Sequence, residues 1–149
     1  MAWLPCYYQD MDGKRAVILS FAAYAAGYTL TYLGSLYLKA DFISERSSVV
    51  MSMYSIMTTI LLTLIFTAWY FYSQRTKPRL TYGLYFGCAI VFFFFIGDFV
   101  LTVLPSVLNG NITRALSYYI NPLFITHLAI IPIVAAVTGE YLAKVKRPH

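Results

Sequence analysis

The sequence predicts an all-α integral membrane fold: an antiparallel bundle of four transmembrane helices, forming a single membrane domain over residues 1–149. Three observations predict it. Hydrophobic residues make up 60% of the chain and charged residues only 11%, whereas a soluble domain has about 25% charged residues. Four long apolar segments follow one another, each close to the roughly 20 residues that a helix needs to cross a bilayer. The basic residues lie at the ends of these segments.

The first apolar segment, residues 16–38, contains no charged residue. Its beginning imitates a signal peptide with a cleavage site at Ala23-Tyr24-Ala25, but two aspartates precede it and the apolar run continues far beyond that site. We therefore expect a retained helix. Tyr24, Tyr28 and Tyr32 recur at four-residue spacing. Because hydroxyl groups in lipid need partners, this stripe is predicted to face protein.

Small residues predict where helices approach one another closely, because they let two backbones come together within a membrane. They occur as pairs at four-residue spacing on three of the expected helices: Ala23/Gly27, Gly83/Gly87 and Ala135/Gly139.

The second apolar segment, residues 48–72, carries Ser55 and Thr59 on one face and ends in the aromatic run 69–72, which is typical of an anchor at the headgroup level. The third and fourth segments, residues 80–104 and 118–143, are expected to be neighbours because a short loop joins them.

Asp98 in the third segment and His127 in the fourth are ionisable residues well inside apolar runs. Such residues are costly in lipid and suggest a functional site. Counted from Leu104 and Tyr118, the two lie within about one helical turn in depth, so we expect an ion pair or hydrogen bond between them. A purely structural pair that fixes the helix register is the alternative.

Polar groups from all four helices are expected in the same outer layer of the bilayer. Pro132 has no N–H group, so the carbonyl group of Leu128 loses its helical hydrogen bond and becomes a further acceptor in this layer. The predicted ligand-binding residues are Asp98, His127, Tyr32, Thr31, Ser55 and Thr59.

The basic residues predict the orientation. Eight lysines and arginines flank the two termini and the second loop, whereas three lie in the first and third loops. By the positive-inside rule, both termini are cytoplasmic. Asn111-Ile112-Thr113 in the outward loop matches a glycosylation acceptor, which matters only if the source is eukaryotic. The eight residues are Lys14, Arg15, Arg75, Lys77, Arg79, Lys144, Lys146 and Arg147, and the three are Lys39, Arg46 and Arg114.

Several classes of function find no support in the sequence. Cys6 and Cys88 lack metal-ligand or redox spacing, and a haem between two imidazoles is disfavoured because only His127 is interior. No catalytic motif occurs. Glu140 lies within a turn of Lys144 and is expected to form a surface ion pair. We therefore expect no metal and no cofactor. We also expect no nucleic-acid partner, because the basic residues do not gather on one face.

The predicted function is the binding or passage of a proton or small polar solute at an intramembrane site near Asp98 and His127. One four-helix bundle is narrow for a pore, so a homo-oligomer is expected. Two alternatives remain open: a non-catalytic subunit or assembly partner of a larger membrane complex, and an enzyme acting on a lipid-soluble substrate with Asp98 and His127 as acid and base.

Overall fold

A computed structural model describes residues 13–37, 45–72 and 78–145. These residues are helical nearly throughout, and no strand occurs among them. Four helical stretches, Gly13–Tyr37, Val49–Tyr72, Leu80–Leu108 and Pro122–Val145, are long and apolar enough to cross a membrane. The predicted all-α, four-span membrane bundle is therefore confirmed. Its elements are α1 (Gly13–Tyr37), α2 (Glu45–Tyr72), α3 (Leu80–Asp98), the π-helical turn η1 (Phe99–Val103), α4 (Leu104–Leu108), α5 (Ile112–Tyr119) and α6 (Pro122–Val145).

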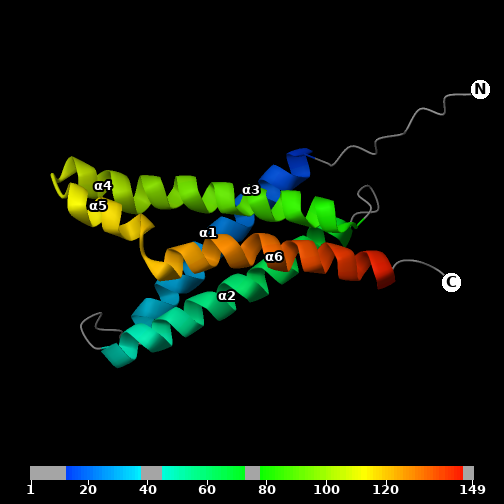
Figure 1. The fold of residues 1–149 in the computed structure, drawn as a ribbon, viewed down its shortest axis with the longest axis horizontal. Helices are drawn as coiled ribbons and strands as arrows, with labels where there is room; N and C mark the ends of the chain where they lie inside the picture. The colour runs from blue at the N-terminus through cyan, green and yellow to red at the C-terminus, as the bar shows by residue number, and fades with distance from the viewer. Residues whose placement is uncertain (1–12, 38–44, 73–77, 146–149) are drawn as a thin grey trace, which may run out of the picture.

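The helices alternate in direction along the chain (Figure 1). The start of α1, the end of α2, the start of α3 and the end of α6 lie at one end of the bundle, which we call the closed end. There the Arg15 Nη2 atom of α1 donates a hydrogen bond of 2.8 Å to the carbonyl oxygen of Trp69 in α2. The opposite end, formed by α4 and α5, is called the hairpin end. Helix α1 crosses the others diagonally.

The chain between the third and fourth spans differs from the predicted short loop 105–117. Pro105 has no N–H group, so an α-helical ladder is not maintained there. The helix widens instead: the Leu104 N–H bonds to the carbonyl of Phe99, five residues back. The span then continues to Leu108, and the chain reverses at Gly110, whose φ of 76° favours glycine. Helix α5 follows, so the last span begins at Pro122 rather than at Tyr118.

Helices α3 and α6 are packed backbone to backbone through the glycines that the sequence indicated. A Cβ atom at Gly83 would collide with the carbonyl group of Ala135. One at Gly87 would lie 2.7 Å from the Cα atom of Pro132. From the other side, a Cβ at Gly139 would lie 2.6 Å from the carbonyl oxygen of Arg79. The prediction of close approach is confirmed for these residues of α3 and α6. At Gly27 of α1 a Cβ would meet side chains instead, Phe94 at 3.3 Å and Leu62 at 3.6 Å.

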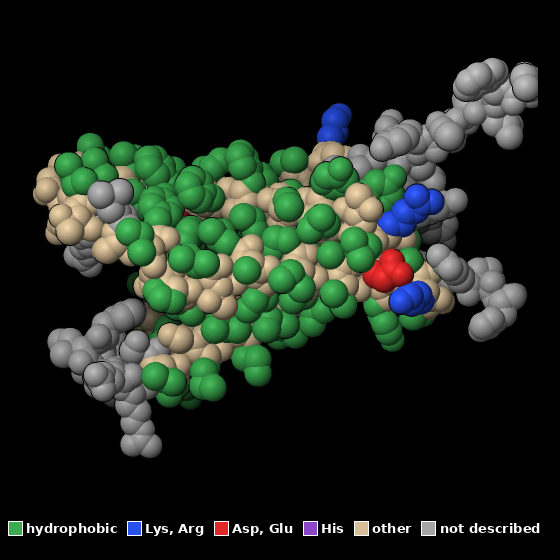
Figure 2. All heavy atoms as spheres, in the orientation of Figure 1, with side chains coloured by type: hydrophobic (Ala, Val, Ile, Leu, Met, Phe, Trp, Pro, Cys, Tyr) green, Lys and Arg blue, Asp and Glu red, His purple; other side chains and the backbone are tan. Residues whose placement is uncertain are grey.

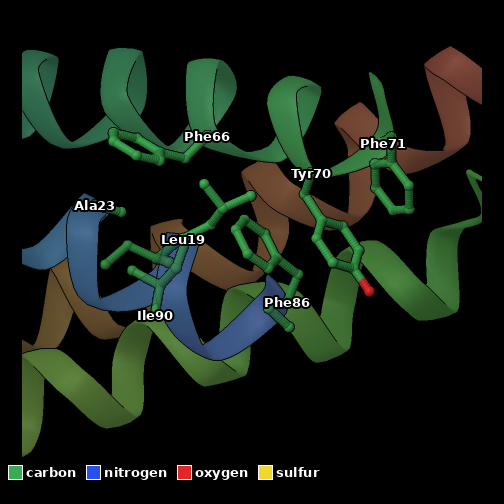
Figure 3. Close-up of a cluster of buried hydrophobic side chains, with 9 residues drawn as sticks. Leu19, Ala23, Phe66, Tyr70, Phe71, Phe86 and Ile90 are labelled. Atoms are coloured by element: carbon green, nitrogen blue, oxygen red, sulfur yellow. The ribbon is translucent and has the colours of Figure 1, made fainter. Parts of the chain in front are cut away.

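The closed end contains an aromatic core between α1, α2 and α3 (Figure 3). The rings of Tyr70 and Phe86 stack with centroids 4.7 Å apart, and both side chains are fully buried. Leu19 and Ala23 of α1 pack against this group. This core fixes the ends of three helices in one place.

Apolar side chains cover the length of the bundle, and on the face drawn in Figure 2 the charged side chains lie toward the closed end. The expected ion pair is present there, with Lys144 Nζ 3.6 Å from Glu140 Oε1. The predicted tyrosine stripe is wrong in part. Tyr24 is buried, but Tyr28 and Tyr32 are 45% and 56% exposed. A four-residue step advances about 40° further than one helical turn, so the stripe rotates away from the interface.

Cys6 and several basic residues used for the orientation lie outside the described residues: Lys39, Arg75, Lys77, Lys146 and Arg147.

Candidate functional site

Asp98 is the last residue of α3 and is half-buried in the third span. Tyr24 of α1 reaches it across the interface: its hydroxyl is within interaction range of the Asp98 carboxyl group, and its ring packs edge-on against Phe94, with centroids 5.1 Å apart. Gly97 permits this approach, since a Cβ there would collide with the tyrosine ring. The Tyr24 side chain thus lies against Gly97, next to Asp98 in the chain.

Tyr119 is the last residue of α5, at the hairpin end. Its ring stacks on Phe95 at 5.1 Å between centroids and meets Phe124 edge-on at 5.4 Å. Burial raises the pKa of Tyr119 above its usual value, and the negative charge of Asp98 raises it further. Tyr24 of α1 and Tyr119 of α5 therefore both lie near enough to Asp98 to be influenced by its charge.

The π-helical turn η1 begins directly after Asp98. Single π turns within α-helices are uncommon and are found frequently at functional sites. Here the turn widens the helix between Asp98 and Pro105, directly before α4 and α5 of the hairpin end.

His127 forms a second polar cluster, between α6 and α2. Its Nδ1 atom lies 2.7 Å from the carbonyl oxygen of Leu123, and its Nε2 atom lies 3.1 Å from Ser55 Oγ. Because a carbonyl oxygen only accepts, these partners assign the proton to Nδ1. The Nε2 atom faces α2, 3.1 Å from the Ser55 hydroxyl, which can donate to it or accept from it.

The predicted pairing of Asp98 with His127 is not what the structure contains, because both ring nitrogens of His127 bond elsewhere. The α3–α6 register explains the separation. Gly83 lies opposite Ala135, and Gly87 lies opposite Pro132. By this register the position opposite Asp98 is near residue 121. His127 is therefore displaced by about six residues, or about 9 Å along the axis.

The error arose from where the depth was counted. The prediction measured from Leu104 and Tyr118, but the chain reverses at Gly110. A second break, between α5 and α6, adds residues on the His127 side. There the N–H of Leu123 bonds to Asn121 Oδ1 at 2.9 Å.

The remaining predicted site residues lie on α2 and α1. Ser55 is bonded to His127. Thr59 is 8% exposed on the same helix, one turn further along. Thr31 is half-buried on α1, whereas Tyr32 is exposed on the outside of the bundle and belongs to neither cluster.

Sequence reasoning missed Tyr24 and Tyr119 as neighbours of Asp98. Gly97 next to the aspartate was the available signal for Tyr24, because an interior glycine marks a close approach. No comparable signal pointed to Tyr119, because its position is set by the helical hairpin of α4 and α5.

Within the described ranges, no three His, Cys, Asp or Glu side chains lie together as a metal site would require. Comparison with protein-family models, with curated proteins and with solved structures finds no match for the chain. The class that the fold defines is therefore a small multi-pass helical membrane protein.

Proposed function

We propose that this protein binds or passes a proton or a small polar solute within the membrane, at two stations formed by Asp98 and His127. The observation that carries the proposal is the setting of Asp98: a carboxyl group half-buried in an apolar span, beside a buried phenol and directly before a π-helical turn. An ionisable side chain at such a depth is costly, so a role that needs its charge or proton explains its presence.

The two stations have complementary chemistry. Asp98 ionises by releasing a proton, whereas His127 presents a basic nitrogen that takes one up. Their offset of about six residues along the α3–α6 register spaces them at successive depths rather than in one pair. This spacing suits stepwise transfer better than a fixed structural ion pair.

The same proposal includes an orientation and an assembly. The count of basic residues favours cytoplasmic termini, and then the hairpin end and Asp98 are nearer the outer surface. A single narrow bundle favours a symmetric assembly of several copies, in which apolar outer faces pack together.

The test uses purified protein in lipid vesicles loaded with a pH-sensitive dye, with light scattering to follow the entry of urea and glycerol. We expect Asp98→Asn to fold normally and to lose proton or solute flux, because it keeps the shape but removes the titratable charge. Glu140→Gln is the matched control, since Glu140 is the acid of a surface ion pair at the closed end. Equal flux in wild type, Asp98→Asn and Glu140→Gln would overturn the proposal.

A further inference from the structure

The hydroxyl group of Tyr24 is buried at the interface between α1 and α3. The residue is 7% exposed, whereas the next two tyrosines of the stripe, Tyr28 and Tyr32, lie largely in the open. The Tyr24 hydroxyl makes no hydrogen bond of good geometry to a described residue. Because a buried donor without a partner costs free energy, the position of this hydroxyl calls for a physical reason.

Tyr54 of α2 shows how another tyrosine hydroxyl of the bundle is satisfied. It donates a hydrogen bond of 3.0 Å to the carbonyl oxygen of Leu30, which belongs to α1. The hydroxyls of Thr63 and Thr138 bond instead to carbonyl groups of their own helices. A phenol does not fold back in this way, because its hydroxyl lies at the far end of a rigid ring. The acceptor for Tyr24 must therefore come from another helix.

Gly97 of α3 brings the Tyr24 hydroxyl close to such an acceptor. A Cβ atom at Gly97 would collide with the ring of Tyr24 and with its hydroxyl oxygen, so the end of the phenol lies directly on the α3 backbone. Asp98 is the next residue, and consecutive Cα atoms are about 3.8 Å apart. The Asp98 carboxyl group is near enough to act on the hydroxyl both by its charge and as a hydrogen-bond acceptor.

Packing holds the Tyr24 ring in this place. The ring meets that of Phe94 edge-on, with centroids 5.1 Å apart, and Phe94 lies one helical turn before Asp98 on the same side of α3. Gly27 leaves room for this contact, since a Cβ atom there would lie 3.3 Å from the Phe94 ring. The hydroxyl is therefore set in position before any charge forms at Asp98.

We propose that Tyr24 is the positioning residue of the Asp98 station: its hydroxyl donates a hydrogen bond to the carboxyl group when that group is ionised. This inference rests on the proposed function and deepens it, because it names the group that lets Asp98 carry a charge inside an apolar span. A hydrogen bond to an ionised acceptor is roughly twice as strong as one between neutral groups. The phenol keeps its own proton, since phenols ionise at far higher pH than carboxyl groups.

Other described titratable groups near Asp98 are placed differently. Tyr28 lies one turn further along α1 and contacts the Tyr24 ring, with centroids 6.2 Å apart. Tyr119 of α5 is near enough to be influenced by the charge of Asp98. His127 of α6 is displaced by about 9 Å along the axis. Tyr24 is distinguished by its hydroxyl, which lies against the residue adjacent to Asp98.

The experiment follows the infrared band of the protonated Asp98 carboxyl group in lipid vesicles as the pH is changed. This band is identified as the one that Asp98→Asn lacks. Tyr24→Phe keeps the ring but removes the hydroxyl, so we expect the band to persist to a pH about one unit higher, a tenfold change in proton affinity. Tyr28→Phe is the matched control, because that residue is 45% exposed, and it should titrate like wild type.

Gly97→Ala is a second test that changes neither partner. Its methyl group takes the place of the Tyr24 hydroxyl, so the band should shift in the same direction as in Tyr24→Phe. Thermal unfolding of each variant in detergent shows whether the fold is retained.

Two outcomes would overturn this inference. One is a Tyr24→Phe variant that titrates like wild type, even if it is less stable, because Tyr24 would then only fill space. The other is an equal shift in Tyr28→Phe. The proposed function fails by a different result, an unchanged flux in Asp98→Asn. If the flux is unchanged there while Tyr24→Phe still shifts the band, the hydrogen bond stands and the proposed function is wrong.

Discussion

The two ends of the bundle hold the same helices together by different means. At the closed end, stacked aromatic rings and glycines in backbone contact leave little room, as shown by the buried pair Tyr70 and Phe86 and by Gly83 against Ala135. Toward the hairpin end, Tyr24 packs against Gly97 next to Asp98, and α3 changes to a π turn. The difference suggests that most of the stability comes from packing at the closed end. That packing offsets the cost of the buried polar groups near the hairpin end.

The largest expected effect on stability is at the α3–α6 contact near the closed end. Gly83→Ala places a methyl group where the backbone of Ala135 lies, and backbone yields less readily than a side chain, so we expect a loss of about 3 kcal/mol in the free energy of unfolding. Gly13→Ala, where nothing lies within 4 Å, is the control and should change little. Unfolding in mixed micelles measures both. Equal stability of the two variants would show that the glycine contact is not tight.

A smaller effect of opposite sign is expected at Ser20 in α1. Its hydroxyl is fully buried beside the aromatic core and has no partner within the described part of the chain. Removing an unpaired buried hydroxyl relieves its desolvation cost, so Ser20→Ala should stabilise the protein by about 1 kcal/mol. Thermal unfolding in detergent is the measurement. Destabilisation instead would mean that Ser20 binds a partner, and that the closed end is less purely apolar than its rings indicate.

The smallest expected effect is the coupling between Asp98 and His127. Because their clusters are about 9 Å apart along the register, the stability changes of Asp98→Asn and His127→Gln should add to within about 0.5 kcal/mol in the double variant. Ser55→Ala combined with His127→Gln gives the contrast, since those two residues share a hydrogen bond and should not add. Strong coupling of Asp98 with His127 would merge the two stations into one site.

The sequence by itself determined the membrane class, the four spans, the glycine contacts and the two ionisable residues. These depend on local quantities: apolar length, side-chain size and the cost of charge in lipid, all of which are read from neighbours in the chain. It also singled out Ser55, because a hydroxyl on the inner side of a span needs a partner.

Only the tertiary structure decided which polar groups meet. Helix packing joined Ser55 to His127 and placed Tyr24 against Gly97, next to Asp98. The reversal at Gly110 and the break before α6 shifted the α3–α6 register by about three residues, a little less than one helical turn. Register depends on where a turn falls and on which backbones touch, and a few residues of error there move a side chain to a different partner. For this reason two features emerge only when the helices are placed together: the stacking of Tyr119 on Phe95, and the buried hydroxyl of Thr67, which has no hydrogen-bond partner among the described residues.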